Sequence, residues 1–221
     1  MSLPQIAPYE PPAPDRLPDN RAQWRPEPER AVLLVHDMQR YFLRPYAHGA
    51  EPLNRATANI ARLAAACRAA GVPVVYTAKP GDMTRERRGL EIDFWGSGMR
   101  AVPEHTSIDD SVRPEPGDTL LTKWRYSAFA QTDLEQRLTA MGRDQLLVTG
   151  VYAHIGCLLT ASDAFMRDIQ PFFVADAMAD FTAEDHHFAV RYVARRCGVA
   201  LTTDAALDGV RATDRSTAAA G

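Results

Sequence analysis

The sequence is poor in cysteine, in net charge and in long apolar stretches. Its 221 residues contain three cysteines, Cys67, Cys157 and Cys197, and an odd count in a chain of this length argues against a disulfide framework. Lysine and arginine number 25 against 28 aspartate and glutamate residues, so the basic surface of a nucleic-acid-binding protein is missing. No apolar run approaches the roughly 18 residues that cross a membrane. We therefore expect neither nucleic acid nor a membrane as a partner.

The sequence also lacks the motifs that mark bound groups. There is no G-x-G-x-x-G after a strand-like run and no G-x-x-x-x-G-K-[ST], the two common phosphate-binding loops. A C-x-x-C pair and an H-E-x-x-H helix, which signal metal sites, are missing as well. So is the G-x-S-x-G turn that carries a serine nucleophile. We therefore expect no cofactor and no metal.

The two ends of the chain differ in composition from its middle. Eight of the 16 prolines lie in residues 1–28, and proline fixes φ and lacks an amide donor. We therefore expect residues 1–29 to form an extended arm over the surface or over a partner subunit. The arm has neither the basic start nor the apolar stretch of a secretory signal, which predicts a cytoplasmic protein. Residues 208–221 are small and polar and are expected to be disordered, which leaves residues 30–207 as a single domain.

Between these ends, short apolar runs alternate with stretches of helical spacing. The predicted strands cover residues 31–37, 72–77, 119–124, 145–150, 171–176 and 199–203. The predicted helices cover residues 54–70, 133–141, 157–167 and 184–197. Apolar runs without a polar face are typical of strands buried on both sides, so the alternation predicts an α/β fold with a doubly wound, mostly parallel sheet and helices on both faces. The charged, irregular segment 80–118 is a candidate lid.

Three residues whose side chains can act in catalysis lie at or after the ends of predicted strands. Asp37 ends the first strand, Lys123 ends the third, and Cys157 opens the helix after the fourth, where a helix dipole lowers a thiol pKa. Each also fits a plain role: a turn-capping aspartate, an ion-paired or solvated lysine, and a small buried core residue. Because ligands of open α/β sheets bind at the carboxyl ends of strands, the three together predict a site there.

Longer strings around these residues resemble a known family. The strings are HDMQRYF (36–42), TKWRYSAF (122–129), GVYAHIGC (150–157) and TASDAFMRDIQPFFVADAMADF (160–181). They resemble the isochorismatase family, over about residues 5 to 207. The resemblance implies the arrangement of Asp37, Lys123 and Cys157, a six-stranded parallel sheet, a non-proline cis peptide between Val151 and Tyr152, and a homodimer or a higher homo-oligomer.

The superfamily holds two chemistries. Its amide hydrolases use the cysteine as nucleophile, and nicotinamidases add a metal-binding Asp-x-His cluster after the first aspartate; this chain reads Met38-Gln39-Arg40 there. The isochorismatase branch cleaves an enolpyruvyl ether without needing the thiol, and the strings at 124–129 and 152–157 resemble that branch. The resemblance therefore implies hydrolysis of a small dianionic, chorismate-derived enolpyruvyl ether with release of pyruvate. A cysteine-dependent amidohydrolase is the alternative.

In the ether hydrolysis, Asp37 is the expected general acid, protonating the vinyl carbon. Lys123 is expected to orient Asp37 and to contact substrate oxygens, although its charge would lower the pKa of the acid. Arg88 fits as a carboxylate clamp. Tyr152 and the backbone amides near Gly156 are expected to hold a second carboxylate.

Further assignments concern the walls of the site. Trp95 either excludes water or packs the lid. Lys79 replaces a glutamine that the family carries in the string TAQP, and it is expected to bind a carboxylate or to select the ring substituent. His154 is expected to be structural, and His186 and His187 to lie at the surface.

The sequence does not decide between two candidate substrates. Isochorismate would give 2,3-dihydro-2,3-dihydroxybenzoate for siderophores, whereas 2-amino-2-deoxyisochorismate would give trans-2,3-dihydro-3-hydroxyanthranilate for phenazines. The proline-rich start resembles the enzymes of the amino substrate, and the string at 150–169 resembles those of the siderophore pathway. Only about 14 residues follow Leu207, so no fused carrier domain is expected.

Overall fold

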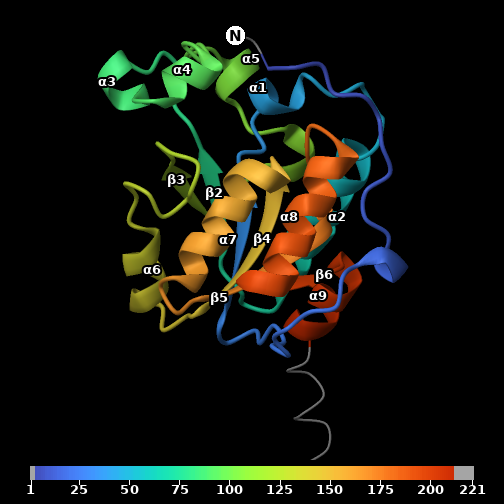
Figure 1. Ribbon diagram of the computed structural model, residues 1–221. Helices are drawn as coiled ribbons and strands as arrows, with labels where there is room; N and C mark the ends of the chain where they lie inside the picture. The colour runs from blue at the N-terminus through green and yellow to red at the C-terminus, as the bar shows by residue number, and fades with distance from the viewer. Residues whose placement is uncertain (1–2, 212–221) are drawn as a thin grey trace, which may run out of the picture.

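Six short apolar segments form one parallel sheet in the computed structural model, which describes residues 3–211 (Figure 1). The strands are β1 (Ala31–His36), β2 (Val74–Ala78), β3 (Thr119–Thr122), β4 (Gln145–Val151), β5 (Gln170–Ala179) and β6 (Val199–Leu201). Their order across the sheet is β3-β2-β1-β4-β5-β6, and every neighbouring pair is parallel. The order reverses beside β1, which confirms the predicted doubly wound architecture and places a switch point at the carboxyl ends of β1 and β4.

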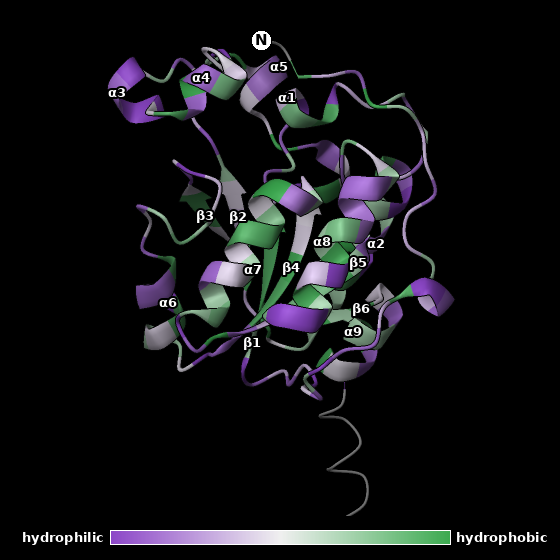
Figure 2. Ribbon diagram, viewed as in Figure 1, coloured by the Kyte–Doolittle hydropathy of each residue, from purple (hydrophilic) through white to green (hydrophobic). Residues whose placement is uncertain are grey.

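Helices cover both faces of the sheet, so alternate side chains of each central strand enter different cores. Leu33 and Val35 of β1 pack toward α2 (Leu53–Ala69) and α9 (Thr203–Val210). Val32 and Leu34 pack toward α6 (Leu134–Ala140), α7 (Leu158–Phe165) and α8 (Ala183–Arg196). All residues of β1 and β4 are buried, as the uninterrupted apolar runs predicted. Figure 2 shows β4 and α7 as largely hydrophobic, whereas α8 and the lid helix α3 carry hydrophilic residues.

The carboxyl-terminal boundary differs from the prediction. Strand β6 ends at Leu201 because the Thr202 side chain accepts a hydrogen bond from the Ala205 amide and caps a helix there. That helix, α9, runs to Val210, so the expectation of a disordered tail from residue 208 is wrong for residues 208–210. The rest of that prediction, from residue 212 onward, lies outside the described residues. Strand β5 is also longer than predicted, reaching Ala179.

The proline-rich arm lies along the chain's own domain (Figure 1). Its only helical piece within residues 3–29 is one 3₁₀ turn, Pro14–Arg16. Ile6 is buried and pairs with Tyr46, and the Tyr9 hydroxyl lies 3.0 Å from Nδ1 of His186. His186 is fully buried in α8, so its expected surface position is wrong; Nε2 lies 2.9 Å from the Ala175 carbonyl oxygen.

The segment between β2 and β3 is more ordered than expected and lies over the carboxyl ends of the strands (Figure 1). It contains three short helices, α3 (Arg85–Arg88), α4 (Glu91–Trp95) and α5 (Pro103–Thr106), and one 3₁₀ turn, η2 (Asp110–Val112). Helix α1 (Arg40–Leu43) lies beside α5. We call residues 80–118 the lid. Within residues 3–211, no helix has the length and apolarity to cross a membrane.

Candidate active site

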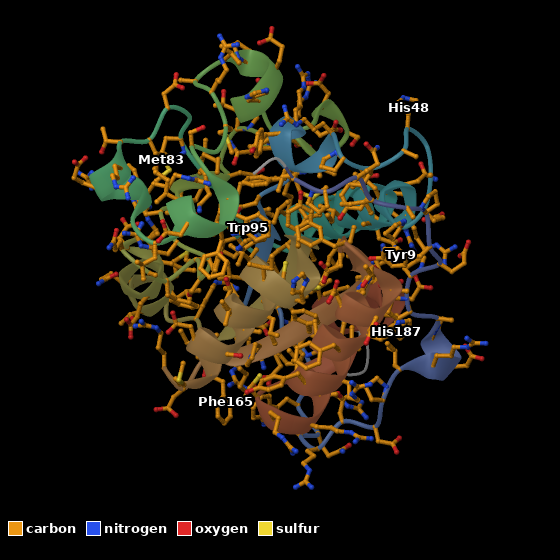
Figure 3. All side chains as sticks on the ribbon, turned by 45° about the horizontal axis from the view of Figure 1, so that its top comes forward. Tyr9, His48, Met83, Trp95, Phe165 and His187 are labelled. Atoms are coloured by element: carbon orange, nitrogen blue, oxygen red, sulfur yellow. The ribbon has the colours of Figure 1, made fainter. Side chains whose placement is uncertain are left out.

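A cavity lies at the carboxyl ends of β1, β2, β3 and β4, beneath the lid. Seven of the eight site residues predicted from the sequence line it: Asp37, Lys79, Arg88, Trp95, Lys123, Tyr152 and Gly156. Figure 3 shows the lid residues Met83 and Trp95, which also belong to its wall. The eighth predicted residue, Cys157, is not among the lining residues. The lid and four strand ends thus form one enclosed site.

Asp37 is held by a hydrogen bond to one carboxylate oxygen and an ion pair to the other. It follows β1 in a left-handed conformation, with φ at 50°, which an aspartate tolerates better than most residues. The Thr77 hydroxyl donates to Oδ1 at 2.7 Å, and the Lys123 ammonium lies 2.9 Å from Oδ2. The side chain is only 7% exposed. The carboxyl group is therefore fixed in place at the floor of the cavity.

The Lys123 ammonium contacts three oxygen atoms of the protein. Besides Asp37, its ammonium donates to the carbonyl oxygens of Arg125 at 2.7 Å and Tyr126 at 3.1 Å. These contacts fix the ammonium beside Asp37, and its orienting role and its contact with substrate oxygens stay predictions. We call Asp37 and Lys123 the floor pair.

The environment of Asp37 contains the predicted conflict between burial and charge. Burial raises the pKa of Asp37, but the Lys123 charge, His36, the Thr77 hydrogen bond and Lys79 lower it, and the net pKa lies below the ordinary value. The empty site therefore holds a carboxylate at neutral pH. Burial lowers the pKa of His36 to about 4, so that imidazole is neutral.

Lys79 forms a second buried ion pair, which the sequence did not predict. Its ammonium donates to Oε2 of Glu91 on α4 in a short contact, and both side chains are at most 8% exposed. Burial lowers the pKa of Lys79 to about 8, helped by the Lys123 charge and opposed by Glu91. The Gln39 side chain brackets the Lys79 backbone, accepting from its amide at 2.7 Å and donating to its carbonyl at 2.9 Å. We call Lys79 and Glu91 the lid pair.

Arg88 turns inward, away from its basic neighbours in the lid. It is 7% exposed, and its Nε donates to the Gly96 carbonyl oxygen in a short contact. Nη1 lies 3.8 Å from Oε2 of Glu91. Gly98, with φ at 78°, allows this position, because a Cβ there would lie 2.6 Å from Nη1. The guanidinium therefore lines the cavity and keeps further donors available to an anion.

Aromatic rings form one wall of the cavity. Phe181 packs against Tyr152, with ring centroids 4.3 Å apart, and against Trp95 at 5.9 Å. The Trp95 Nε1–H donates to the Tyr126 hydroxyl at 2.6 Å. The Tyr152 hydroxyl donates to the Phe42 carbonyl oxygen at 2.7 Å, so its proton is not free for the carboxylate that we expected it to hold. Sequence reasoning missed Phe181 and Tyr126, which lie inside family-like strings but carry no spacing signal.

Two glycines let the floor close tightly around His36. A Cβ on Gly156 would lie 2.1 Å from Cε1 of His36, and one on Gly150 would lie 2.1 Å from the His36 carbonyl oxygen. Nδ1 of His36 lies 2.9 Å from the carbonyl oxygen of Val151. The peptide bond between Val151 and Tyr152 is cis, as the resemblance implied.

Cys157 does not have the surroundings of a nucleophile. It is fully buried, and burial raises the pKa of its thiol well above the ordinary value, contrary to the expected lowering at a helix start. Its Sγ donates only a weak hydrogen bond, to the Thr149 carbonyl oxygen at 3.8 Å. Desolvation of a thiolate here outweighs the partial charges of the short helical turn, and the residue packs in the core beneath the floor.

The chain thus has a doubly wound α/β fold with a parallel sheet and a cavity at the carboxyl ends of its central strands. A cysteine hydrolase from Pseudomonas syringae pv. phaseolicola has a similar fold, with a TM-score of 0.79, 24% identity and coverage of 88% of this chain and 98% of that one. Residues 31–205 match the isochorismatase domain. The chain belongs to the isochorismatase family.

Two relatives are similar over almost the whole chain. The phenazine biosynthesis protein PhzD of Pseudomonas fluorescens is 55% identical over 202 residues, which are 91% of this chain and 97% of that protein. The isochorismatase of Bacillus subtilis is 49% identical over 208 residues, which are 94% of this chain and 67% of that protein.

Proposed function

We propose that this chain hydrolyses the enolpyruvyl ether of isochorismate or of 2-amino-2-deoxyisochorismate. The products are pyruvate and either 2,3-dihydro-2,3-dihydroxybenzoate or trans-2,3-dihydro-3-hydroxyanthranilate. The observation that carries the proposal is Asp37, a buried carboxyl group fixed by Thr77 and Lys123 at the floor of a cavity whose lining contains no thiol. Two relatives named for phenazine biosynthesis and for isochorismatase support it.

The reaction needs one acid directed at carbon. Asp37 transfers its proton to the terminal CH₂ of the vinyl ether, and the ether carbon becomes an oxocarbenium ion. Water adds to that cation and loses a proton, and the resulting hemiketal collapses to pyruvate and the ring alcohol. Lys123 then faces the carboxylate that the proton transfer leaves behind, 2.9 Å away, and stabilises it.

Protonation of Asp37 is the difficult step, because the free enzyme favours the carboxylate form of this residue. A bound dianion brings two negative charges into the cavity, and these raise the pKa of Asp37 in the complex. An acid with a low intrinsic pKa is also the stronger donor once it is protonated. The substrate thus helps to prepare the catalyst that cleaves it.

The remaining predicted residues bind and shield the substrate. Arg88 is the carboxylate clamp, since a guanidinium matches a carboxylate with two parallel hydrogen bonds. Trp95, Tyr152 and Phe181 form an apolar wall that keeps bulk water from the cation. Gly156 lines the cavity and leaves room for the His36 ring, which a side chain there would displace. The cysteine amidohydrolase alternative lacks support, because Cys157 is buried and its thiol is held neutral.

Pyruvate release tests the proposal. Wild type and Asp37→Asn are each assayed with both substrates, and pyruvate is measured through its enzymatic reduction. The variant keeps the size and the hydrogen-bond acceptor but has no acidic proton, so kcat should fall by about 10²- to 10⁴-fold. Asp93→Asn, an exposed change on α4, is the control and should keep full activity. No pyruvate from either substrate with wild type would overturn the proposal.

We also propose that the chain forms a homodimer or a higher homo-oligomer in the cytoplasm. Leu90, Phe94 and Met166 are 81%, 67% and 73% exposed and line one groove between the lid and α7, which is an apolar surface suited to a second copy. The three cysteines are free thiols, which suits a reducing compartment. Light scattering on the purified protein and cell fractionation test the two statements.

A further inference from the structure

Glu91 carries an unusual combination of burial and an unused hydrogen-bond acceptor. Its side chain is 8% exposed and lines the cavity. Oε2 accepts from Lys79, whereas Oε1 is buried and receives no hydrogen bond from any group within residues 3–211. No other buried side-chain oxygen or nitrogen of these residues lacks a partner. A buried carboxylate oxygen without a donor is unfavourable, so its retention in a cavity wall points to a ligand.

The lid pair does not increase the attraction of the cavity for a dianion. The charged side chains of its lining are Asp37, Lys79, Arg88, Glu91 and Lys123, three cations and two anions. Lys79 and Glu91 cancel each other, so the net charge would be the same without them. A pair that adds no net charge yet leaves one acceptor open serves to recognise a donor rather than to attract carboxylates.

The open acceptor distinguishes the groups of the substrate class proposed above. A substrate carboxylate is repelled by Glu91, and a ring hydroxyl offers one neutral donor. A primary amine at the same ring position is protonated at neutral pH and offers several donors with a positive charge. Both donors would make a charge-assisted hydrogen bond to the Glu91 carboxylate, but only the ammonium adds a Coulomb attraction to it, so the amine is the better match.

Resting on the proposed function, we propose that Glu91, held by Lys79, binds the ring amino group and selects 2-amino-2-deoxyisochorismate over isochorismate. Lys79 is a positioning residue: it fixes Oε2 and thereby leaves Oε1 to the substrate. The selected substituent lies on the ring rather than on the vinyl ether, so the selection acts mainly through KM. The chain is then the hydrolase that follows an amination of the chorismate-type ring.

The test compares kcat/KM for pyruvate release from both substrates in wild type and in the double variant Lys79→Gln/Glu91→Gln. The double change removes one charge of each sign and keeps the size of both side chains, so the net charge of the cavity stays the same. Wild type should prefer the amino substrate by about tenfold or more, a ratio equivalent to 1.4 kcal/mol. The double variant should lose that preference through a rise in KM for the amino substrate, with isochorismate changed by less than about threefold.

A single change and a control exclude a merely structural effect. Glu91→Gln alone should lower the preference as well, and Asp93→Asn on the same helix should leave it unchanged. Thermal unfolding of every variant shows whether it is folded. Equal losses on both substrates, or a wild-type preference for isochorismate, would overturn this inference while leaving the ether hydrolysis intact. Failure of wild type to release pyruvate from either would overturn the proposed function instead.

Discussion

Two buried ion pairs face the same cavity and differ in how completely their polar atoms are satisfied. In the floor pair, Oδ1 of Asp37 accepts from Thr77, Oδ2 lies 2.9 Å from the Lys123 ammonium, and that ammonium also donates to two backbone carbonyl oxygens. In the lid pair, one oxygen of Glu91 has no donor within the described residues. The floor pair joins two strand ends, whereas the lid pair joins a strand end to a short helix. The floor pair is held by protein groups, which suits a catalytic acid that needs one fixed position. The lid pair leaves one carboxylate oxygen for a hydrogen bond from the substrate, which suits recognition of a ring substituent.

The largest effect should come from breaking the floor pair. Lys123→Met leaves the buried Asp37 carboxylate without its counter-charge, which costs about 3–5 kcal/mol of folding stability. It also frees the carboxyl group to move, and a misplacement of 1 Å costs about 100-fold in rate. The pKa of Asp37 should rise, so the fall of kcat/KM with increasing pH should move to higher pH.

Pyruvate-release kinetics over a pH series and urea unfolding measure both changes. Lys79→Gln/Glu91→Gln is the matched comparison, because it removes the other buried pair. It should keep kcat within about threefold on isochorismate. A similar loss of kcat in Lys123→Met and in Lys79→Gln/Glu91→Gln would contradict the assignment of catalysis to the floor pair and of substrate selection to the lid pair.

Acid should destabilise the fold through two buried histidines, His36 at the floor of the cavity and His186 in α8. Burial lowers the pKa of His36 to about 4 and that of His186 to about 3, so both are neutral in the folded protein and protonated more readily when it unfolds. A depressed pKa stabilises the folded state above the unfolded value of about 6.5 and loses that effect as pH falls toward the folded value. For His36 the loss is on the order of 3 kcal/mol.

Urea unfolding between pH 7 and pH 4 measures this loss. Asp37 does not contribute to this loss, since its lowered pKa stabilises the fold fully above the unfolded value of 3.8 and the effect is lost only as pH falls below it. His48→Gln changes an exposed histidine and should leave the pH dependence as it is. Stability that is constant across this range would mean that the buried histidines have ordinary pKa values.

A smaller effect should follow from displacing the carboxylate clamp. In Gly98→Ala, the new methyl group would lie 2.6 Å from Nη1 of Arg88 at a φ that favours glycine, so the guanidinium has to move. We expect KM to rise about tenfold for both substrates, because a charged hydrogen bond is worth about 1.5–3 kcal/mol. Gly117→Ala is the control, since it is also at positive φ but nothing lies within 4 Å of its Cβ. An unchanged KM in Gly98→Ala would remove Arg88 from substrate binding.

The smallest effect should come from the thiol. Cys157→Ala removes a buried sulfur whose pKa is raised and which does not line the cavity. We expect kcat/KM for pyruvate release to stay within about threefold of wild type, with about 1 kcal/mol lost from folding stability. Loss of activity in a folded variant would return the cysteine to the mechanism.

The sheet and the floor of the site were predictable from the sequence, and the lid was not. Apolar runs such as 31–37 and 145–150 lie between helices with clear spacing, so local pattern and tertiary structure agree. Asp37 and Lys123 follow such runs, and parallel strands bring their ends together. The sequence did not identify Glu91 as a site residue. Its partner Lys79 is 12 residues away across a loop, and α4 is too short to show the 3.6-residue spacing of a helix.

The structure also differs from the sequence-based predictions where the position of a residue along the chain did not indicate its contacts in the fold. Cys157 stands at a helix start, yet the helix packs its thiol into the core. Tyr152 enters the cavity, yet its hydroxyl donates to the Phe42 backbone. The composition of residues 199–203 placed Thr202 in a strand, but its side chain caps α9. Burial and hydrogen-bond partners decided each case, and both depend on the folded chain.

The central claim is that Asp37 is a carboxylate in the empty site and becomes the acid when the dianionic substrate binds. The pH dependence of kcat/KM reports the free enzyme, and that of kcat reports the complex, so pyruvate release measured from pH 4 to pH 9 separates the two states. The account predicts that the pKa governing kcat lies clearly above the pKa governing kcat/KM. The same pKa in both profiles, with both profiles altered in Asp37→Asn, would contradict it.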